Sequence, residues 1–279
     1  MSKYRAMQCP LDEDLSALSR FLREHGVMHR ITEERGHQVV WTRDAEQAEI
    51  VRRVYAQGIA EHSAAPERPV PGNTHWQQML RRIPVTLSVL LITAIAALLT
   101  GLGTNIDTVV WLTFNPVIVE GRALTLLPFD PQQWWRLLTP MFLHFGWLHL
   151  AFNAMWFWEL GRRIEMRSGG LWLLGLTLLF GLVSNLAQWW FGGAAIFGGL
   201  SGVLYGLLGY CWLYQLITPN SYFDLPKGVV VMMLGWLLLC MSGVVELLGF
   251  GAIANAAHVG GLLMGCACGA IAGALHRGR

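Results

Sequence analysis

Four polar residues of this sequence lie within stretches that are otherwise apolar or rich in glycine, and their side chains could together carry out acyl transfer. They are His149, Asn153, Ser201 and His258. A polar or ionisable side chain inside an apolar segment costs free energy, so each is a candidate functional residue. A serine hydroxyl becomes a good nucleophile only when a neighbouring base accepts its proton, and His258 is the candidate base for Ser201.

The other two residues have the spacing of a pair of hydrogen-bond donors. His149 and Asn153 are four residues apart, so they share one face of a helix. Acyl transfer places negative charge on a carbonyl oxygen, and one preorganised donor to that oxygen is worth roughly 3–4 kcal/mol. The backbone N–H of Ser201, at the start of a predicted helix, is a third donor. No acidic residue lies near His258 in the sequence, which favours a Ser–His dyad, and Tyr205 is spaced to pack on the imidazole.

Three other interpretations use the same residues differently. A serine among glycines also lets two membrane helices pack closely, with no chemical role for its hydroxyl. A transporter or a haem-binding bundle would use His149 and His258 as ligands and would give Ser201 no function. An inactive relative of an enzyme, serving as a membrane chaperone, is the third alternative, which an intact serine and histidine pair disfavours.

The composition places these residues in a membrane protein. Of the 279 residues, 54% are hydrophobic and only 14% are charged, whereas a soluble domain has about 25% charged residues. Residues 1–82 hold 12 of the 20 Lys and Arg residues and 11 of the 18 Asp and Glu residues, so a charged module precedes an apolar body. The net charge of +2 is too small to indicate a nucleic-acid partner. The five cysteines lack the spacing of metal ligands, and we expect neither a metal nor a cofactor.

Six apolar segments follow the charged module, and each is near the ~20 residues needed to cross a membrane. They cover about residues 83–103, 147–166, 169–191, 201–218, 227–248 and 253–275. If the segments alternate in direction, one side collects Arg81, Arg82, Arg162, Arg163, Arg167, Lys227, Arg277 and Arg279. Only Arg122 and Arg136 fall on the other side. Because Lys and Arg concentrate on the cytoplasmic side, both termini are predicted to be cytoplasmic.

Small residues predict how two of these segments pack. A small residue recurs at every fourth position of the last segment, at Ala257, Gly261, Gly265, Gly269 and Gly273. The segment around Ser201 has the same spacing, at Gly198, Gly202 and Gly206. Such strips allow close backbone approach. We expect this approach to bring the Ser201 hydroxyl to the His258 imidazole.

Two connecting segments are also expected to lie at membrane depth. The long loop over residues 104–146 is rich in tryptophan, which favours the membrane interface, and we expect Arg136 to brace it through carbonyl groups. The glycine-rich residues 192–199 are expected to re-enter the membrane while buried in protein. Glu165 is expected in a cytoplasmic charge cluster with Arg162 and Arg163.

A small α+β module is predicted ahead of the apolar body. Two segments with helical spacing flank a β-hairpin with Gly36 in its turn, and Asp44 is the expected N-cap of the second helix. No catalytic constellation is found in it, so we interpret it as a docking or regulatory module. The expected domains are a cytoplasmic α+β domain over 1–60, a Pro-rich linker over 61–80 and a six-helix domain over 81–279.

Together the motifs of the apolar body resemble those of the rhomboid intramembrane serine proteases. The matching motifs are GLSG (199–202), HLAFN (149–153), AHVGGLLMG (257–265) and the WR pair (135–136). They occur in the family's order over roughly residues 80–275, and no motif position departs from the pattern. The N-terminal module is similar to the cytoplasmic domain of bacterial members of the family.

The resemblance implies a polytopic α-helical membrane protein, with a six-transmembrane-helix bundle behind a small N-terminal α+β domain. It implies a Ser201–His258 dyad in a bacterial inner membrane, which cleaves transmembrane protein substrates near the outer face and contacts membrane lipids. The implied oxyanion donors are His149, Asn153 and the Ser201 amide, and the supporting residues are Tyr205, Gly199, Gly202 and Gly261. A lateral gate near the fifth segment and a cap loop are implied as well. Because hydrolysis needs water, we expect a polar cavity that opens outward above Ser201.

Overall fold

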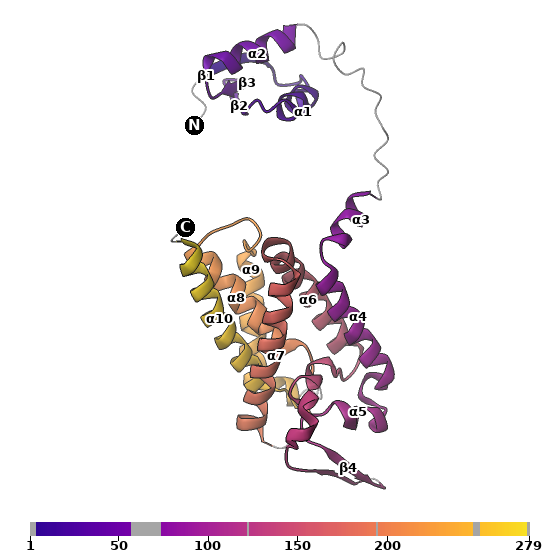
Figure 1. Cartoon of the computed structure of the whole chain (residues 1–279). Helices are drawn as coiled ribbons and strands as arrows, with labels where there is room; N and C mark the ends of the chain where they lie inside the picture. Colours follow the sequence, from indigo (N-terminus) through magenta and orange to yellow (C-terminus); the bar gives the residue numbers. More distant parts are fainter. Residues whose placement is uncertain (1–3, 57–73, 122, 194, 248–251, 278–279) are drawn as a thin grey trace. The chain divides into compact units, whose positions relative to one another are not determined.

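The computed structural model describes residues 4–56, 74–121, 123–193, 195–247 and 252–277. The chain forms two compact units, Met1–Gly72 and Asn73–Arg279, each with its own hydrophobic core (Figure 1). Residues 61–73 of the expected linker lie outside the described residues. Residues 74–80 of the expected linker are helical and belong to helix α3, which covers Thr74–Arg81.

The N-terminal unit combines a three-stranded antiparallel sheet with two helices. The strands lie in the order β1–β3–β2, where β1 is Tyr4–Pro10, β2 is His29–Glu34 and β3 is His37–Thr42. The helices are α1 (Ser16–Glu24) and α2 (Ala45–Ala56). Leu18, Leu22 and Val51 from the helices share a buried core with Val40 of β3. Their spacing of three to four residues along each helix is what places them on the sheet.

The predicted hairpin and helix cap of this unit are confirmed. Strands β2 and β3 pair across a two-residue turn of Arg35 and Gly36, whose φ angles are 49° and 77°. Positive φ at both positions matches the twist of a tight hairpin. The Asp44 carboxylate accepts a hydrogen bond from the Gln47 N–H at 2.8 Å. Strand β1 was not predicted, because its sequence YRAMQCP alternates only weakly and ends in proline.

The six apolar segments all form helices in the second unit. These are α4 (Pro84–Leu99), α6 (Trp147–Ser168), α7 (Gly170–Gly192), α8 (Ser201–Ile217), α9 (Lys227–Met241) and α10 (Asn255–Arg277). Among the described residues, α7 and α10 are long and apolar enough to cross a membrane by length and composition. Helices α4, α8 and α9 have 16, 17 and 15 residues, which is shorter than expected. The presence of six membrane-spanning helices therefore stays a prediction.

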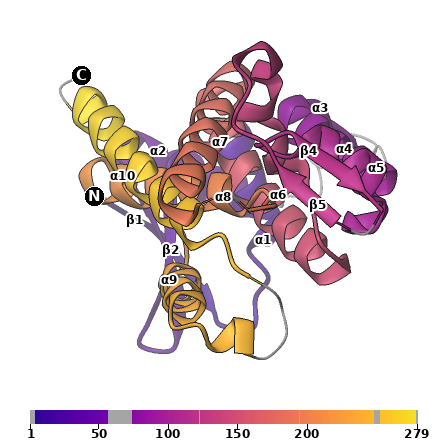
Figure 2. The same cartoon turned by 90° about the horizontal axis from the view of Figure 1, so that it is seen from below.

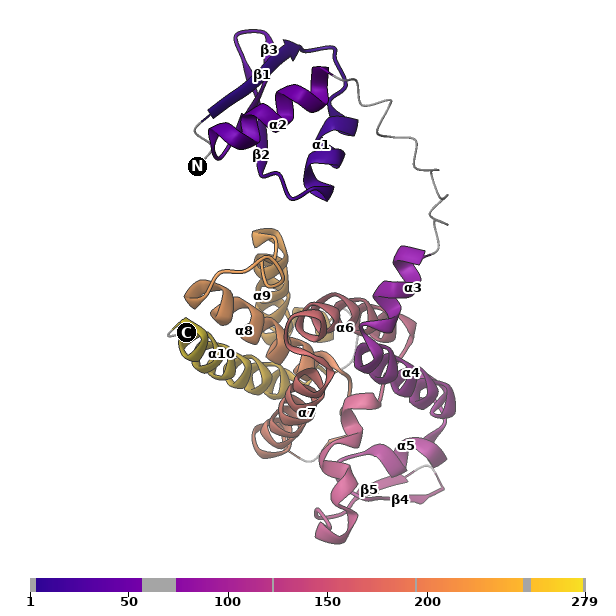
Figure 3. The same ribbon diagram turned by 45° about the horizontal axis from the view of Figure 1, so that its top comes forward.

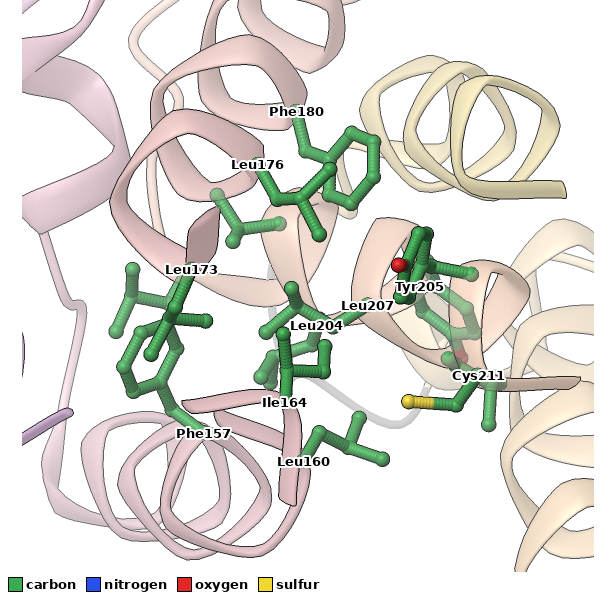
Figure 4. Packing of buried hydrophobic residues seen from close by; sticks show 14 of the residues in the cluster. Phe157, Leu160, Ile164, Leu173, Leu176, Phe180, Leu204, Tyr205, Leu207 and Cys211 are labelled. Carbon is green, nitrogen blue, oxygen red and sulfur yellow. The ribbon is translucent and has the colours of Figure 1, made fainter. Parts of the chain in front are cut away.

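Helix α8 lies in the middle of the bundle, and its side chains are buried on every face along most of its length. Its neighbours in Figure 3 are α6, α7, α9 and α10. Figure 4 shows Ile164, Phe180, Leu204 and Leu207 converging from α6, α7 and α8 on one hydrophobic cluster. A helix that is apolar all round is suited to this central position. Ser201, the first residue of α8, is thereby fixed at one end of the core.

Helices α8 and α10 pack with backbone against backbone. A Cβ at Gly261 of α10 would overlap the carbonyl oxygen of Gly202, and one at Gly265 would overlap that of Gly206. The predicted close approach of the two strips is confirmed at these positions. Gly198 differs from the prediction, because it precedes α8 and packs instead on the segment before α6. The missing side chains let α10 lie closer to α8 than side chains would allow.

The segment between α4 and α6 is folded rather than extended. It contains α5 (Ile106–Leu112), the hairpin β4 (Val117–Glu120) and β5 (Ala123–Leu126), and the 3₁₀ helices η3 (Pro131–Leu137) and η4 (Thr139–Phe142). In Figure 2 the hairpin lies beside α5, on the side of the bundle away from α10. Nη1 of Arg136 donates to the carbonyl oxygens of Val110 at 2.7 Å and Thr113 at 2.8 Å. These bonds confirm that Arg136 braces the segment through carbonyl groups.

The expectation for Glu165 is wrong. This residue is buried, and its carboxylate accepts hydrogen bonds from the N–H groups of Val85 at 2.8 Å and Thr86 at 2.7 Å. The Thr86 hydroxyl donates to the same carboxylate at 2.7 Å. Glu165 thus caps the start of α4, where backbone N–H groups have no acceptor in the helix and attract negative charge. The two arginines of the expected cluster pair instead with Glu159.

Candidate active site

The structure brings Ser201 and His258 together. Nε2 of His258 lies 2.7 Å from Oγ of Ser201, although the two residues are 57 positions apart in the sequence. Ser201 is the first residue of α8, and His258 lies in the first turn of α10. The glycine contact between the two helices sets this distance. His258 is only 6% exposed, so the pair lies within the protein rather than on its surface.

Tyr205 lies against the imidazole, as its position one turn after Ser201 predicts. The ring centroids of Tyr205 and His258 are 5.0 Å apart. The Tyr205 hydroxyl donates to the carbonyl oxygen of Met233 in α9 at 2.9 Å. Nδ1 of His258 has no hydrogen-bond partner among the described residues. An aromatic ring, rather than a carboxylate bonded to Nδ1, therefore lies beside the histidine among the described residues.

His149 approaches the same site from the start of α6. A Cβ added at Gly199 would lie 2.7 Å from Nε2 of His149 and 3.7 Å from Oγ of Ser201. Gly199 also has a φ of +120°, a backbone conformation that residues other than glycine rarely adopt. Gly199 is thus the point where His149 and Ser201 approach each other. Nδ1 of His149 accepts a hydrogen bond from the Phe145 N–H at 3.3 Å, so Nε2 is the nitrogen that faces the site.

Asn153 lies one turn after His149 on the same helix and is buried. Its Nδ2 donates to the carbonyl oxygen of His149 at 2.7 Å, while its Oδ1 has no partner among the described residues. One amide N–H is therefore used within α6, and the second is available to another acceptor. Its role as an oxyanion donor stays a prediction.

A small cavity of about 10 Å³ adjoins Ser201. Ser184 and Asn185 of α7 contribute polar groups to its lining, together with Gly198 and Gly199. The Ser184 hydroxyl has no partner among the described residues. A space of this size, lined in part by polar groups, has room for about one water molecule. It is too small for a substrate segment.

The polar residues of α7 were not singled out from the sequence. Ser184, Asn185 and Gln188 are all buried, and Oε1 of Gln188 accepts a hydrogen bond from the Ala257 N–H at 3.2 Å. They line the cavity or hold the start of α10 next to His258. The criterion that selected His258, a polar side chain within an apolar segment, also selects these three.

Among the described residues, no group of three or more His, Cys, Asp or Glu side chains is placed to hold a metal ion. The polar groups that meet at this site are the serine hydroxyl, two histidine rings and the amide of Asn153. A serine hydroxyl hydrogen-bonded to an imidazole nitrogen, beside a second histidine and a helix start, is an arrangement that can support acyl transfer.

Comparison with known protein families agrees with this arrangement. The family model described as the rhomboid domain matches residues 131–275, which is more than half of the chain. A second model, the rhomboid N-terminal domain, matches residues 1–63. The chain belongs to the rhomboid family, and membership makes it a polytopic helical membrane protein.

Several curated relatives that are similar to this chain are named rhomboid protease GlpG. The chain is 40% identical over 182 residues to the rhomboid protease GlpG of Pectobacterium atrosepticum, covering 65% of this chain and 60% of that one. It is 44% identical over 141 residues to the rhomboid protease GlpG of Serratia proteamaculans, covering 50% and 49% of the two chains. The matching regions therefore span between about half and three fifths of the relatives' own length.

Proposed function

We propose that this chain is an intramembrane serine endopeptidase that cleaves transmembrane protein substrates. One observation carries the proposal, namely the hydrogen bond between the Ser201 hydroxyl and the His258 imidazole inside a bundle of apolar helices. Membership of the rhomboid family, and relatives that are named rhomboid proteases, support the same activity. The transporter and haem-binding alternatives give this hydrogen bond no role.

Ser201 is the proposed nucleophile and His258 the general base. As Oγ of Ser201 attacks the scissile carbonyl carbon, Nε2 of His258 accepts the hydroxyl proton. The carbonyl oxygen becomes negative, and the proposed donors to it are His149, Asn153 and the backbone N–H of Ser201. The C–N bond then breaks, His258 gives its proton to the leaving nitrogen, and an ester remains on Ser201.

Water completes the reaction. Nε2 of His258 accepts a proton from a water molecule as its oxygen attacks the ester carbon. The ester bond to Ser201 breaks, His258 returns the proton to Oγ, and the new carboxyl terminus leaves. The cavity of about 10 Å³ beside Ser201 supports this step, because it can hold about one water molecule next to the reacting atoms. Ser184, whose hydroxyl lacks a partner among the described residues, is the proposed anchor for that water.

The positions of the cations support one orientation of the bundle in the membrane. Arg162, Arg163 and Arg167 lie near the end of α6 that is away from His149, which supports cytoplasmic termini and a dyad in the outer half of an inner membrane. The N-terminal unit is then a cytoplasmic domain over residues 1–60, joined by the segment 61–80 to the protease domain.

Substrate entry requires part of the bundle to move, since the cavity beside Ser201 cannot hold a peptide. Most side chains of α9 face away from the bundle, and only Met233, Leu237 and Cys240 are buried. This loose packing supports α9 as the gate. The expected cap loop between α9 and α10 includes residues 248–251, which lie outside the described residues.

Two alanine variants test the proposed function. Ser201→Ala and His258→Ala are each expected to abolish cleavage of a model transmembrane substrate in proteoliposomes, while the protein remains folded. Ser88→Ala is a matched control, because the Ser88 hydroxyl is exposed and, among the described residues, donates to the Pro84 carbonyl of its own helix. A fluorophosphonate probe should label the wild type and the control but not Ser201→Ala.

Full activity of both alanine variants would refute the mechanism, and a haem absorption band in the purified protein would favour the haem-binding alternative. Asn153→Ala provides a graded test of the oxyanion donors. We expect a partial loss of kcat, on the order of 100-fold, because one donor is lost and the others remain. A rise in kcat would contradict the role given to Asn153.

A further inference from the structure

We infer that two irregular segments, the turn Gly101–Gly103 and the residues Phe142–Gly146, hold the His149 ring in the tautomer that carries its proton on Nε2. The inference deepens the proposed function, because it explains how His149 can donate a hydrogen bond at the site. Among the described residues, no hydrogen bond or ring contact joins either segment to Ser201 or His258, so we treat their residues as positioning residues rather than catalytic ones.

The backbone of Phe145 sets the tautomer. Its N–H donates to Nδ1 of His149 at 3.3 Å, which requires a lone pair on Nδ1. A neutral imidazole has one protonated and one unprotonated nitrogen, so the proton must then be on Nε2. Nε2 is the nitrogen nearest to the space above Gly199, where an oxyanion formed at Ser201 would lie. The Phe145 amide therefore makes His149 a donor without the need for a positive charge.

The turn Gly101–Gly103 fixes the position of Phe145. A Cβ at Gly103 would lie only 2.5 Å from the Phe145 ring, so the ring packs directly on the backbone of the turn. The carbonyl oxygen of Leu102 accepts a hydrogen bond from the Gly146 N–H at 3.2 Å. The Phe145 ring in turn lies nearly parallel to the His149 ring, at a centroid distance of 6.5 Å.

The turn itself is conformationally costly. Gly101, Leu102 and Gly103 have φ angles of 54°, 56° and 90°, so three consecutive residues are in the left-handed region. A leucine in this region costs about 1–2 kcal/mol and persists only where surrounding contacts require it. Local hydrogen bonds with Thr100 and Thr104 hold the turn, and its contacts with Phe145 and Gly146 connect it to His149.

The ring of His144 also packs against the ring of His149. It is fully buried, and its ring centroid lies 4.9 Å from that of His149. Nδ1 of His144 is bonded to the Phe142 carbonyl at 3.1 Å, which makes it the donor and fixes the ring relative to the backbone. His149 is thus held by a hydrogen bond from Phe145 and by packing against His144.

Gly103→Ala tests the inference, with Gly169→Ala as its matched control. Gly169 has nearly the same φ, 91°, and lies at the other end of α6, but a Cβ there meets nothing within 4 Å. Both variants place a side chain on a residue with nearly the same positive φ, and only Gly103→Ala displaces the Phe145 ring. We expect Gly103→Ala to lower kcat by about 10- to 100-fold, with KM little changed, since one oxyanion donor is worth about 10²–10³ in kcat.

Nitrogen NMR of ¹⁵N-histidine-labelled protein reads the tautomer directly. The wild type should show an unprotonated Nδ1 and a protonated Nε2 for His149, assigned by loss of the signals in His149→Gln. Gly103→Ala should show a mixture of tautomers, and Gly169→Ala should match the wild type. A wild-type ring protonated on Nδ1 would overturn the inference, even if Gly103→Ala does not fold.

The same two glycine substitutions in a His149→Gln protein distinguish an effect on the His149 tautomer from a general loss of structure. The amide of His149→Gln carries a donor whatever the state of Phe145, so adding Gly103→Ala to it should lower kcat no more than adding Gly169→Ala. Equal losses from Gly103→Ala with His149 and with Gln at this position would refute the inference. If the wild type cleaves no substrate, or Ser201→Ala cleaves as well as the wild type, the proposed function fails instead.

Discussion

Two regions position the proposed catalytic groups, and they do so by different physical means. Helices α8 and α10 bring Ser201 to His258 through contact between their backbones, because glycine leaves no side chain between them. His149 is positioned instead by a hydrogen bond and ring contacts from irregular segments. One of these segments, the turn Gly101–Gly103, has left-handed φ angles. The serine and base depend on helix packing, whereas the oxyanion donor depends on loop conformation.

The difference assigns separate tasks to the two regions. The distance between a nucleophile and its base must be short, and rigid close-packed helices maintain such a distance well. A hydrogen-bond donor must in addition present the correct nitrogen, which only a specific partner on the opposite side of the ring can ensure. Changes in the first region should therefore affect folding and chemistry together, and changes in the second should affect chemistry more than stability.

The largest effect is expected from Gly261→Ala. The added methyl group overlaps the Gly202 carbonyl oxygen, so α8 and α10 must separate. We expect a loss of about 3 kcal/mol in the free energy of unfolding, from overpacking, and at least a 100-fold loss of kcat, since a displacement of about 1 Å can cost that much. Equilibrium unfolding in mixed micelles and cleavage assays measure the two losses.

Gly175→Ala is the control for this substitution. Gly175 lies within α7, and a Cβ there meets nothing within 4 Å. The change should be neutral, or stabilising by up to about 1 kcal/mol through helix propensity. If Gly261→Ala behaves like Gly175→Ala, close backbone contact is not what sets the Ser201–His258 distance.

Glu165→Gln is expected to have a smaller effect that appears in stability alone. The amide replaces a carboxylate that accepts hydrogen bonds from Val85 and Thr86 at the start of α4, and it turns one acceptor into a donor. We expect a loss of about 1–3 kcal/mol in unfolding free energy, with kcat of the folded enzyme within about twofold of wild type. Glu159→Gln, a partly exposed partner of two arginines, should cost about 1 kcal/mol or less. A large loss of kcat in Glu165→Gln would show that α4 also positions the site.

The same contrast explains what could be predicted from the sequence. Strips of small residues and polar side chains in apolar segments are local patterns, and they were sufficient to predict the meeting of Ser201 and His258. The cap formed by Glu165 joins residues about 80 positions apart, and no local pattern in the sequence indicates it. His144 was missed for a similar reason, because its packing on His149 depends on the conformation of the loop between them. Helices α4 and α9 end before the predicted apolar segments do, because apolar composition continues past the last helical residue of each.

The smallest effect on catalysis is expected from a change in the N-terminal unit. The titration of Tyr55 in this unit should be independent of cleavage activity. The Tyr55 hydroxyl donates to the Glu13 carboxylate at 2.5 Å, and this bond raises the pKa of Tyr55 to about 12. A tyrosine in an unfolded chain has a pKa of about 10. The folded state therefore holds the proton more tightly, and the stabilisation is complete below about pH 10 and is lost as the pH rises through about 12. The tyrosinate absorbance of the wild type minus that of Tyr55→Phe should titrate near the higher value, with equal kcat at neutral pH; a midpoint near 10 would show that the Glu13 bond does not form in solution.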